Sequence, residues 1–345
     1  MRTRLHSSPR SGKLTSVKLL VAYSSDENYV KLTAVSAVSL LMCHPDDDVT
    51  VIFLANAVAS QSLDLLRHAV ESHGGMFISI DVESALASVA SAGASGYTSF
   101  SAYARLFLPT FLDGKAERVL YLDSDTLVAD RLDGLFTMDL QGKAFAIGYD
   151  CLCNQYKKMI GLPADKPYFN SGVLLIDVKE WLRRQCTERI FRYMQEVRAA
   201  YLLGDQDFFS LVLADDGVPL SPRYNYLTHF FLFTTYRGVL RATGIPSCAW
   251  ASRVDYEKAR QAPAVYHFLG HTLGRPWFKE SRHPMRRAFV DAAVVAGVPE
   301  VAEQSRPMEF HYRLQERLHR LLPRVLFVEA ARLMYRYFFW HTYHV

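Results

Sequence analysis

The sequence predicts an α/β protein in which a mostly parallel sheet is covered by helices on both faces, followed by a helical extension. The first observation is that short apolar runs alternate with helical patterns from residue 17 onward. Strands separated by helices pair in parallel, because each crossover helix packs back onto the sheet. The second observation is that strand patterns become rare beyond residue 280, where prolines divide several helical segments. The third is a composition of 50% hydrophobic and 21% charged residues, which is too apolar for a disordered chain.

The expected elements begin with a buried strand at 17–23 and a helix over 28–43 whose apolar residues recur on one face. Residues 84–98 are mostly Ala, Ser and Gly, which favours a flexible crossing or a short weak helix over a mobile lid. Further strands are predicted at 49–54, 76–80, 118–122, 144–148 and 173–177, and further helices at 60–73, 103–108 and 179–200.

The net charge is unevenly distributed along the 345 residues. Residues 1–18 carry +5 and residues 306–345 carry +4, whereas the chain as a whole carries +4, so the residues between carry −5. An acidic body argues against a nucleic-acid footprint spread over the fold. We expect a basic N-terminal tail over 1–16, one large domain over 17–280, and a helical, basic and aromatic region over 281–345.

The five cysteines form no CxxC pair and no zinc-type spacing with histidine, which favours a reducing compartment. The basic start of the chain lacks the apolar core and cleavage site of a signal peptide. No run reaches the ~18 uncharged apolar residues that a membrane-spanning helix needs. We therefore expect a cytoplasmic protein, or a peripheral one on the cytoplasmic face of the membrane.

The strongest local motif is Asp123-Ser124-Asp125, directly after the predicted strand 118–122. Two carboxylates at the end of a strand can converge on one divalent cation, and oxygen ligands favour Mg²⁺ or Mn²⁺. The alternative is an ordinary acidic turn. The aspartate motif of haloacid-dehalogenase phosphatases is disfavoured, because Thr126 stands where those enzymes have glycine and because the motif lies deep in the chain.

Five other segments carry polar or aromatic residues beside predicted strands and helices. Carboxylates with an aromatic ring suit a nucleobase, and carboxylate acceptors with amide donors suit sugar hydroxyls. Each segment is a weak signal alone, and the order of the set is more specific. The segments are 24–29 (SSDENY), 103–105 (YAR), 168–172 (YFNSG), 205–207 (DQD) and 267–277 (HFLGHTLGRPW).

Taken in this order, the motifs resemble glycosyltransferase family 8, which includes bacterial lipopolysaccharide galactosyl- and glucosyltransferases and glycogenin. The resemblance covers roughly residues 17–278. It implies a GT-A type nucleotide-diphospho-sugar transferase fold, with a Rossmann-like sheet, and an enzyme that is metal-dependent and retains the anomeric configuration. It also implies Mn²⁺ or Mg²⁺ as cofactor, UDP-galactose or UDP-glucose as donor, and a glycan or lipid-linked oligosaccharide as acceptor.

The resemblance makes Asp123, Asp125 and His267 the metal ligands, and this mixed set of carboxylates and imidazole suits Mn²⁺. The alternative for His267 is a core histidine between two aromatic residues. Arg105 would hold a carboxylate of the site or contact the donor, and its alternative is a surface ion pair of little energetic value.

For the nucleotide, the resemblance places Asp26 and Asn28 at the uracil and ribose and stacks Tyr29 on the base. The alternative for Tyr29 is the first buried position of the following helix. Gly270 would let the backbone approach the diphosphate, and Arg275 would clamp it. The donor site as a whole comprises Ser24, Asp26, Asn28, Tyr29, Arg105, Asp123, Ser124, Asp125, Asn170, Ser171, Gly270 and Arg275.

The sugar pocket is expected to contain Asp150, Asn170, Asp205 and Gln206. The alternative for residues 170–172 is a turn before a strand, and that for Asp205 is a helix N-cap. Retention of configuration requires either a covalent intermediate or attack from the face of the leaving group. The resemblance places Gln206 beneath the anomeric carbon, and an amide is a poor nucleophile. We expect front-face attack, with Asp205 and Asp150 as reserve nucleophiles.

One position departs from the family pattern. Arg275 stands where the family has lysine before Pro-Trp, and residues 271–274 make the loop about two residues longer. Arginine can still clamp a diphosphate, through two hydrogen bonds rather than as a point charge. The role of Arg275, and whether His271 reaches the phosphates, stay open at this point.

The C-terminal region combines arginines with nine aromatic residues over 306–345. A basic amphipathic helix with an aromatic end, here 335–340, is typical of an anionic lipid interface. The alternatives are a helix packed on the body and a homodimer contact. Four arginines recur at helical spacing opposite four leucines: Arg313, Arg317, Arg320 and Arg324 against Leu314, Leu318, Leu321 and Leu322.

The sequence therefore predicts a retaining hexosyltransferase that uses a UDP-sugar and a divalent metal, with lipopolysaccharide or another cell-surface oligosaccharide as acceptor. A catalytically inactive, membrane-associated protein that binds sugar nucleotides is the alternative. The intact set of Asp123, Asp125, His267 and Gln206 argues against that alternative, because a protein that only binds could lose it.

Overall fold

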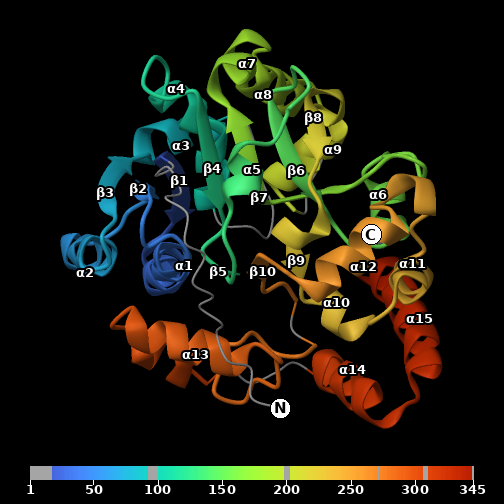
Figure 1. Cartoon of the computed structure of the whole chain (residues 1–345). Coiled ribbons are helices and arrows are strands. Elements are labelled where there is room, and N and C mark those ends of the chain that lie inside the picture. Colours follow the sequence, from blue (N-terminus) through green and yellow to red (C-terminus); the bar gives the residue numbers. More distant parts are fainter. Residues whose placement is uncertain (1–17, 92–99, 198–202, 271, 306–309, 344–345) are drawn as a thin grey trace.

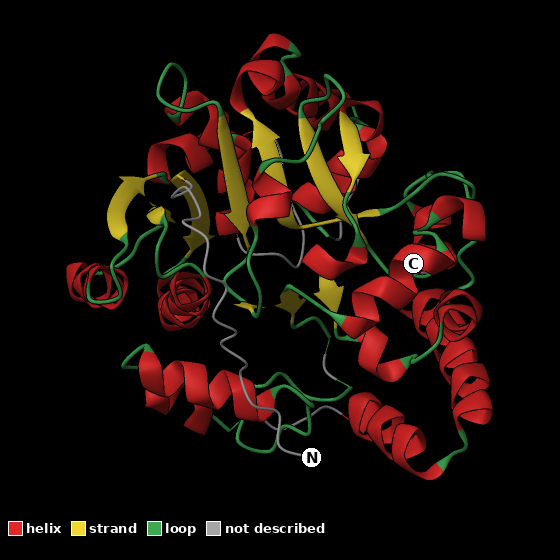
Figure 2. Cartoon of the chain, viewed as in Figure 1, coloured by secondary structure: helices red, strands yellow, loops and turns green. Residues whose placement is uncertain are grey.

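The computed structural model describes residues 18–91, 100–197, 203–270, 272–305 and 310–343. Within these ranges the strands form a seven-stranded sheet in the order β3-β2-β1-β4-β7-β6-β8 and a three-stranded sheet in the order β5-β10-β9 (Figure 1). The larger sheet lies at the centre of the molecule with helices around it (Figure 2).

The larger sheet is mostly parallel, as predicted. Strands β1 (Lys18–Ser25), β2 (Asp48–Ala55), β3 (Met76–Asp81) and β4 (Arg118–Leu122) pair in parallel. β7 (Phe169–Asp177) runs antiparallel to β4 and to β6 (Phe145–Tyr149), and β8 (Gly217–Pro219) is parallel to β6. All six strands predicted from apolar runs are present.

Alternating residues of the strands face two separate cores. Val21 and Tyr23 contribute to one core and Ala22 to the other, because successive strand residues point to opposite faces. The first core includes residues of α1 (Val30–Cys43), α2 (Ser60–Glu71) and α13 (Arg286–Val295). The second includes residues of α3 (Glu83–Ser91), α4 (Leu108–Phe111), α7 (Val178–Arg183), α8 (Cys186–Glu196) and α9 (Asp205–Leu211).

The strand directions gather polar segments at one edge of the sheet. The carboxyl ends of β1, β4 and β6 meet there, and so does the amino end of β7, since β7 is antiparallel to both β4 and β6. The segments that follow or begin these strands are 24–29, 123–125, 150–153 and 169–172. Ligand sites of open α/β sheets lie at this edge.

The smaller sheet was not predicted. It consists of β5 (Thr126–Val128), β9 (Tyr226–Leu227) and β10 (Val265–His267), which are too short to show a periodic pattern. Around it lie α10 (His229–Leu232), α11 (Tyr236–Thr243) and α12 (Arg253–Gln261), and these form a third core with residues of the C-terminal helices.

Several predicted elements differ in detail. The helix expected over 179–200 is divided into α7 and α8, because Gln185 adopts a left-handed conformation with φ of 52°. The helix expected over 103–108 is a 3₁₀ helix, η2 (Phe100–Leu106), followed by α4. Part of 84–98 forms the short helix α3. Residues 1–16, 92–98 and 198–200 lie outside the described part of the chain.

The C-terminal region forms two helices, α14 (Phe310–Leu321) and α15 (Arg324–Tyr343), because Pro323 interrupts the helical pattern. The prediction that prolines divide this region into helical segments is confirmed at Pro323, so Arg324 begins a second helix and does not share one helical face with Arg313, Arg317 and Arg320. Phe327 and Ala331 of α15 are buried in the third core, and Arg241 of α11 bonds to Glu329. Across the described residues, none of the helices combines the length and the apolar character needed to span a membrane.

Candidate active site

Two aspartates and a histidine lie together at the carboxyl edge of the sheet. Asp123 follows β4, Asp125 precedes β5, and His267 ends β10, which pairs with β5. One ligand atom from each residue lies within 4.8 Å of the other two. His267 Nε2 is 3.2 Å from Asp125 Oδ1 and 3.7 Å from Asp123 Oδ2. The structure thus brings together the three residues predicted as metal ligands.

The imidazole of His267 is held with one nitrogen facing the carboxylates. Its Nδ1 lies 2.9 Å from Asn225 Oδ1, so Nδ1–H donates there and the Nε2 lone pair faces the aspartates. Nε2 is buried and has no hydrogen-bond partner among the described residues. A buried polar atom without a partner is costly, and a cation held by the aspartates would satisfy it. The side chains present therefore fit a divalent metal.

Gly172 leaves room for this arrangement. It lies in β7, and its carbonyl accepts the backbone N–H of Asp123 at 2.8 Å. A Cβ at this position would overlap the His267 ring and the Asp123 carboxylate. Residues 170–172 belong to β7, so the alternative that they form a turn before the strand is wrong.

The charges of the group shift one another's pKa values. Burial alone would raise the pKa of Asp125, but His267 and Arg275 lower it. Burial alone would lower the pKa of His267, whereas the charges of Asp125 and Asp123 raise it. The negative field that favours a proton on His267 equally favours a metal cation in place of that proton.

Arg105 is a buried cation between two carboxylates. Its Nη2 lies 3.0 Å from Asp123 Oδ1 and its Nε lies 3.1 Å from Asp205 Oδ2. Nη1 donates to the carbonyl of Ser171 at 2.5 Å, and the guanidinium lies 4.3 Å from the centre of the Tyr121 ring. Burial raises the pKa of Asp205 to about 6. The alternative of a surface ion pair is wrong for Arg105, which is 3% exposed.

A chain of amide hydrogen bonds connects the metal-binding group to the predicted sugar pocket. Asn225 Nδ2 donates to Asn170 Oδ1 at 2.8 Å. Asn170 Nδ2 donates to Asp150 Oδ2 at 2.9 Å and to Gln206 Oε1 at 3.0 Å. Gln206 Nε2 donates to Asp150 Oδ2 at 3.1 Å and to the Tyr168 hydroxyl at 3.3 Å. The polar side chains form one connected network.

The first turn of α9 supplies two members of this site. Gly204 is the N-cap of α9 and Asp205 is its first residue, so the N-cap alternative for Asp205 is wrong. The Asp205 side chain faces Arg105 instead. Gln206, the next residue, reaches Asp150.

The segment predicted to bind the nucleotide base lies next to Arg275. Arg275 Nη1 donates to the Tyr29 hydroxyl at 2.9 Å and lies 3.7 Å from Asp125 Oδ2. Tyr29 is half-buried and packs against the first core, and the fully buried positions of α1 begin at Val30. Asp26 and Asn28 stand at the end of β1, where Asp26 Oδ1 accepts the Asn28 N–H at 3.0 Å.

Two serines that were predicted to belong to the donor site form hydrogen bonds to neighbouring segments. Ser24 Oγ donates to the carbonyl of Ser101 at 2.8 Å, and Ser124 Oγ lies 2.8 Å from Thr33 Oγ1 of α1.

Gly270, predicted to approach the diphosphate, has a φ of 72°, a left-handed conformation that favours glycine. No heavy atom lies within 4 Å of the position that a Cβ would take there. His271 lies outside the described residues.

Comparison with known proteins decides the family. The model of Glycosyl transferase family 8 matches residues 20–281. The chain belongs to glycosyltransferase family 8.

Relatives of this family 8 chain include General stress protein A of Bacillus subtilis, which is 27% identical over 198 residues, 56% of this chain and 65% of the relative. The lipopolysaccharide 1,2-glucosyltransferase of Escherichia coli is 24% identical over 210 residues, 59% of this chain and 61% of the relative. The chain thus spans less than two thirds of either relative.

Solved structures share the fold. The galactosyltransferase LgtC, in complex with donor and acceptor sugar analogues, has a TM-score of 0.66 at 22% identity, over 86% of this chain and 99% of LgtC. The GT-A glycosyltransferase fold predicted from the sequence is therefore confirmed.

Asn225 is the member of the network that the sequence did not reveal. It follows η4 (Pro222–Tyr224) and precedes the short strand β9, in a segment without a recognisable motif. The sequence feature that could have pointed to Asn225 is the glycine at position 148, two residues before Asp150. A Cβ at Gly148 would overlap the Asn225 amide, so this glycine marks a close approach from another segment.

Proposed function

We propose that this family 8 chain is a metal-dependent, retaining hexosyltransferase that moves galactose or glucose from a UDP-sugar to a glycan acceptor. The observation that carries the proposal is the buried, unpartnered His267 Nε2 facing Asp123 and Asp125, joined through Asn225 to Asn170 and the sugar pocket. The diphosphate of the donor would lie beside the proposed metal ligands, and its sugar would lie beside Asn170.

Asp123, Asp125 and His267 would hold Mn²⁺ or Mg²⁺. When bound, the ion supplies positive charge that stabilises the diphosphate leaving group. Arg275 adds a fixed positive charge beside Asp125 and would contact the diphosphate. Tyr29, to which Arg275 donates, would lie under the uracil, with Asp26 and Asn28 at its edge.

In the sugar pocket, Asn170, Asp150 and Gln206 offer convergent amide and carboxylate groups to the sugar hydroxyls. Both reserve nucleophiles face protein groups: Asp205 Oδ2 lies 3.1 Å from Arg105 Nε, whose N–H donates to the Ala102 carbonyl, and Asp150 Oδ2 accepts two amide N–H groups. These contacts support front-face attack, in which the acceptor hydroxyl bonds to the anomeric carbon as the C–O bond to the diphosphate breaks. The leaving phosphate oxygen takes the hydroxyl proton.

The acceptor in this proposal is lipopolysaccharide or another lipid-linked oligosaccharide. A relative named as a lipopolysaccharide 1,2-glucosyltransferase supports it. Residues 17–280 would form the catalytic domain, and 281–345 a region that holds the enzyme peripherally on the cytoplasmic face of a membrane. Exposed Leu321 and Val325, 71% and 75% accessible, support such a surface.

Membrane association can be tested without disturbing the core. Replacing Leu321 and Val325 together by aspartate should reduce co-sedimentation with anionic liposomes, because both side chains are exposed. Unchanged co-sedimentation of that double variant would contradict peripheral binding.

The catalytic proposal is tested with the intact chain and a panel of UDP-galactose, UDP-glucose and UDP-galacturonate. The third donor is included because a plant relative named as a probable galacturonosyltransferase-like protein is 34% identical over 137 residues. We expect UDP release with one of the two hexose donors in the presence of Mn²⁺, abolished by EDTA and restored by excess Mn²⁺. Donor binding without UDP release under any condition would support the inactive binding protein instead.

A further inference from the structure

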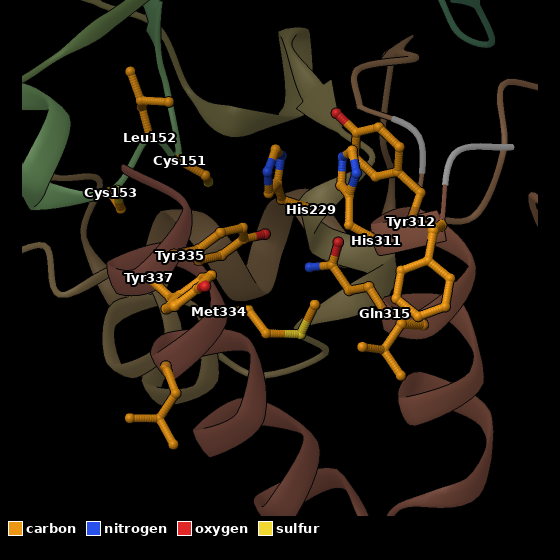
Figure 3. A pocket seen from close by; sticks show the side chains of 13 residues that line it. Cys151, Leu152, Cys153, His229, His311, Tyr312, Gln315, Met334, Tyr335 and Tyr337 are labelled. Carbon is orange, nitrogen blue, oxygen red and sulfur yellow. The ribbon is translucent and has the colours of Figure 1, made fainter. Parts of the chain in front are cut away.

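An apolar pocket lies beside the predicted sugar site, between the C-terminal helices and the body of the molecule (Figure 3). Its volume is about 650 Å³, within the ~300–1,000 Å³ range of small-molecule pockets. Its walls include Cys151, His229 of α10, Tyr312 and Leu314 of α14, and Leu333 and Tyr335 of α15.

Two wall residues are connected directly to the transfer site. Cys151 immediately follows Asp150, the carboxylate that Gln206 and Asn170 contact. His229 follows Thr228, whose backbone N–H donates to the carbonyl of His267 at 3.2 Å. The pocket is therefore next to the position where the acceptor hydroxyl must meet the donor sugar.

Two polar groups mark the inner end of the pocket. Gln315 Oε1 accepts the Thr272 hydroxyl at 2.6 Å, on the loop that leads to Arg275. His229 Nδ1 is buried and has no hydrogen-bond partner among the described residues. In Figure 3 the His229 ring points toward the cavity that Gln315 and Tyr335 also face. Burial lowers the pKa of His229, and the charge of Asp150 opposes that shift.

The other end of the pocket reaches the surface along α14 and α15. Leu314, Leu333 and Tyr337 line the pocket and are 40%, 58% and 68% exposed. The exposed apolar surface continues with Val325. Residues 310–343 also carry six arginines against two glutamates, which suits the phosphate groups that link lipids to glycans. Because the pocket continues onto this apolar surface, it suits an extended, flexible hydrocarbon chain better than a compact ring-shaped ligand.

We propose that this pocket binds the hydrocarbon chain of a lipid-linked acceptor, while the first sugar of that acceptor lies at Asp150 and Gln206. His229 Nδ1 would contact the polar junction between sugar and chain. The inference deepens the proposed function and rests on it, because it assigns the pocket to the acceptor of that transfer. It makes the length of the acceptor's hydrocarbon chain a determinant of binding.

The test compares methyl and dodecyl β-lactoside, each titrated below its micelle-forming concentration and followed by calorimetry. Three forms of the intact chain are used: the unmodified chain, Leu333→Trp, which fills the pocket opening, and the matched control Leu326→Trp. Leu326 lies on the same helix and is 55% exposed, but it does not line the pocket. Leu314→Arg provides a second variant of the lining, and circular dichroism checks the fold of each.

We expect the unmodified chain and Leu326→Trp to bind the dodecyl glycoside about tenfold or more tightly than the methyl glycoside. Leu333→Trp and Leu314→Arg should lose that preference. Equal binding of the two glycosides to the unmodified chain would overturn the inference. So would a preference retained in Leu333→Trp and Leu314→Arg, or lost equally in Leu326→Trp, because each points to general adsorption on the helices.

UDP release from the donor panel is measured separately, with methyl β-lactoside as the acceptor, which carries no hydrocarbon chain. UDP release with no chain-length preference would refute the pocket assignment and leave the proposed transfer intact. A chain-length preference without UDP release from any donor would refute the transfer and with it the assignment of the pocket to an acceptor.

Discussion

Two groups in this molecule contain the same residue types, one histidine and two aspartates, yet their polar atoms meet different partners. In the first group, His44 Nδ1 lies 2.7 Å from Asp47 Oδ2, and His44 Nε2 accepts the backbone N–H of Leu132 at 3.0 Å. Arg131 donates to Asp47 and to Asp133, at 2.7 Å in each case. Both histidine nitrogens and both carboxylates are satisfied by the protein.

The second group consists of His267, Asp123 and Asp125, and one nitrogen of its histidine has no hydrogen-bond partner among the described residues. Asn225 holds His267 through Nδ1, and Nε2 is buried between Asp123 and Asp125 without a hydrogen bond. The comparison teaches that ligand types and proximity are not sufficient for a metal site. What distinguishes the second group is a histidine nitrogen that no hydrogen bond occupies, facing two carboxylates whose negative charge favours a cation beside it.

The largest effect is expected for Asp125→Asn, with Asp133→Asn as the matched control. Loss of the carboxylate charge removes a proposed metal ligand, and kcat/KM for UDP-sugar turnover should fall roughly 10²–10³-fold. Asp133 is paired with Arg131 in the other group, so its variant should keep the unmodified rate. Equal losses of UDP release in the two variants would contradict the claim that only the His267 group takes part in the reaction.

A smaller loss is expected for Asn225→Ala. Without the Asn225 carbonyl, the His267 ring loses the partner that fixes its tautomer and orientation. Mn²⁺ affinity should fall by about 10–100-fold, as is typical when a residue that orients a metal ligand is removed. A Mn²⁺ titration that gives the same affinity for variant and unmodified chain would show that Asn225 does not orient His267.

Gly172→Ala tests the space around the site. Its Cβ would overlap the His267 ring and the Asp123 carboxylate, so the two ligands must move apart. We expect Mn²⁺ affinity to fall by about tenfold, since well-packed side chains resist displacement. Thermal denaturation serves as the control for folding, and an unchanged affinity in a folded variant would contradict the packing described for Gly172.

The smallest effect on function is expected for His44→Ala. This change leaves the buried Leu132 N–H without its acceptor and removes the contact of His44 with Asp47, which Arg131 still binds, and it should reduce the free energy of unfolding by about 1–3 kcal/mol. UDP release should not change. Urea denaturation measures the first quantity, and a loss of turnover in the folded variant would mean that the first group also has a role in the reaction.

Much of the fold could be predicted from the sequence because its central strands are continuous apolar runs between helical patterns. Short elements could not: β9 has two residues and β5 and β10 have three each, so no periodicity marks them. The break between α7 and α8 was also hidden, since the left-handed residue is Gln185 and not a glycine.

The candidate site was predictable where motifs sit at strand ends. Asp123 and Asp125 follow β4, and the structure brings His267 to them by pairing β10 with β5. That pairing joins positions 126 and 267, which no local pattern connects. For the same reason Asn225 was missed: its contacts to His267 and Asn170 are both long-range.

The central claim is that His267, Asp123 and Asp125 form the metal site and that the His44 group does not. The most direct measurement is Mn²⁺ binding, followed by electron paramagnetic resonance, to the unmodified chain, His267→Ala and His44→Ala. We predict one tightly bound Mn²⁺ per chain, lost in His267→Ala and kept in His44→Ala. Tight binding that survives in His267→Ala, or disappears in His44→Ala, would contradict the claim.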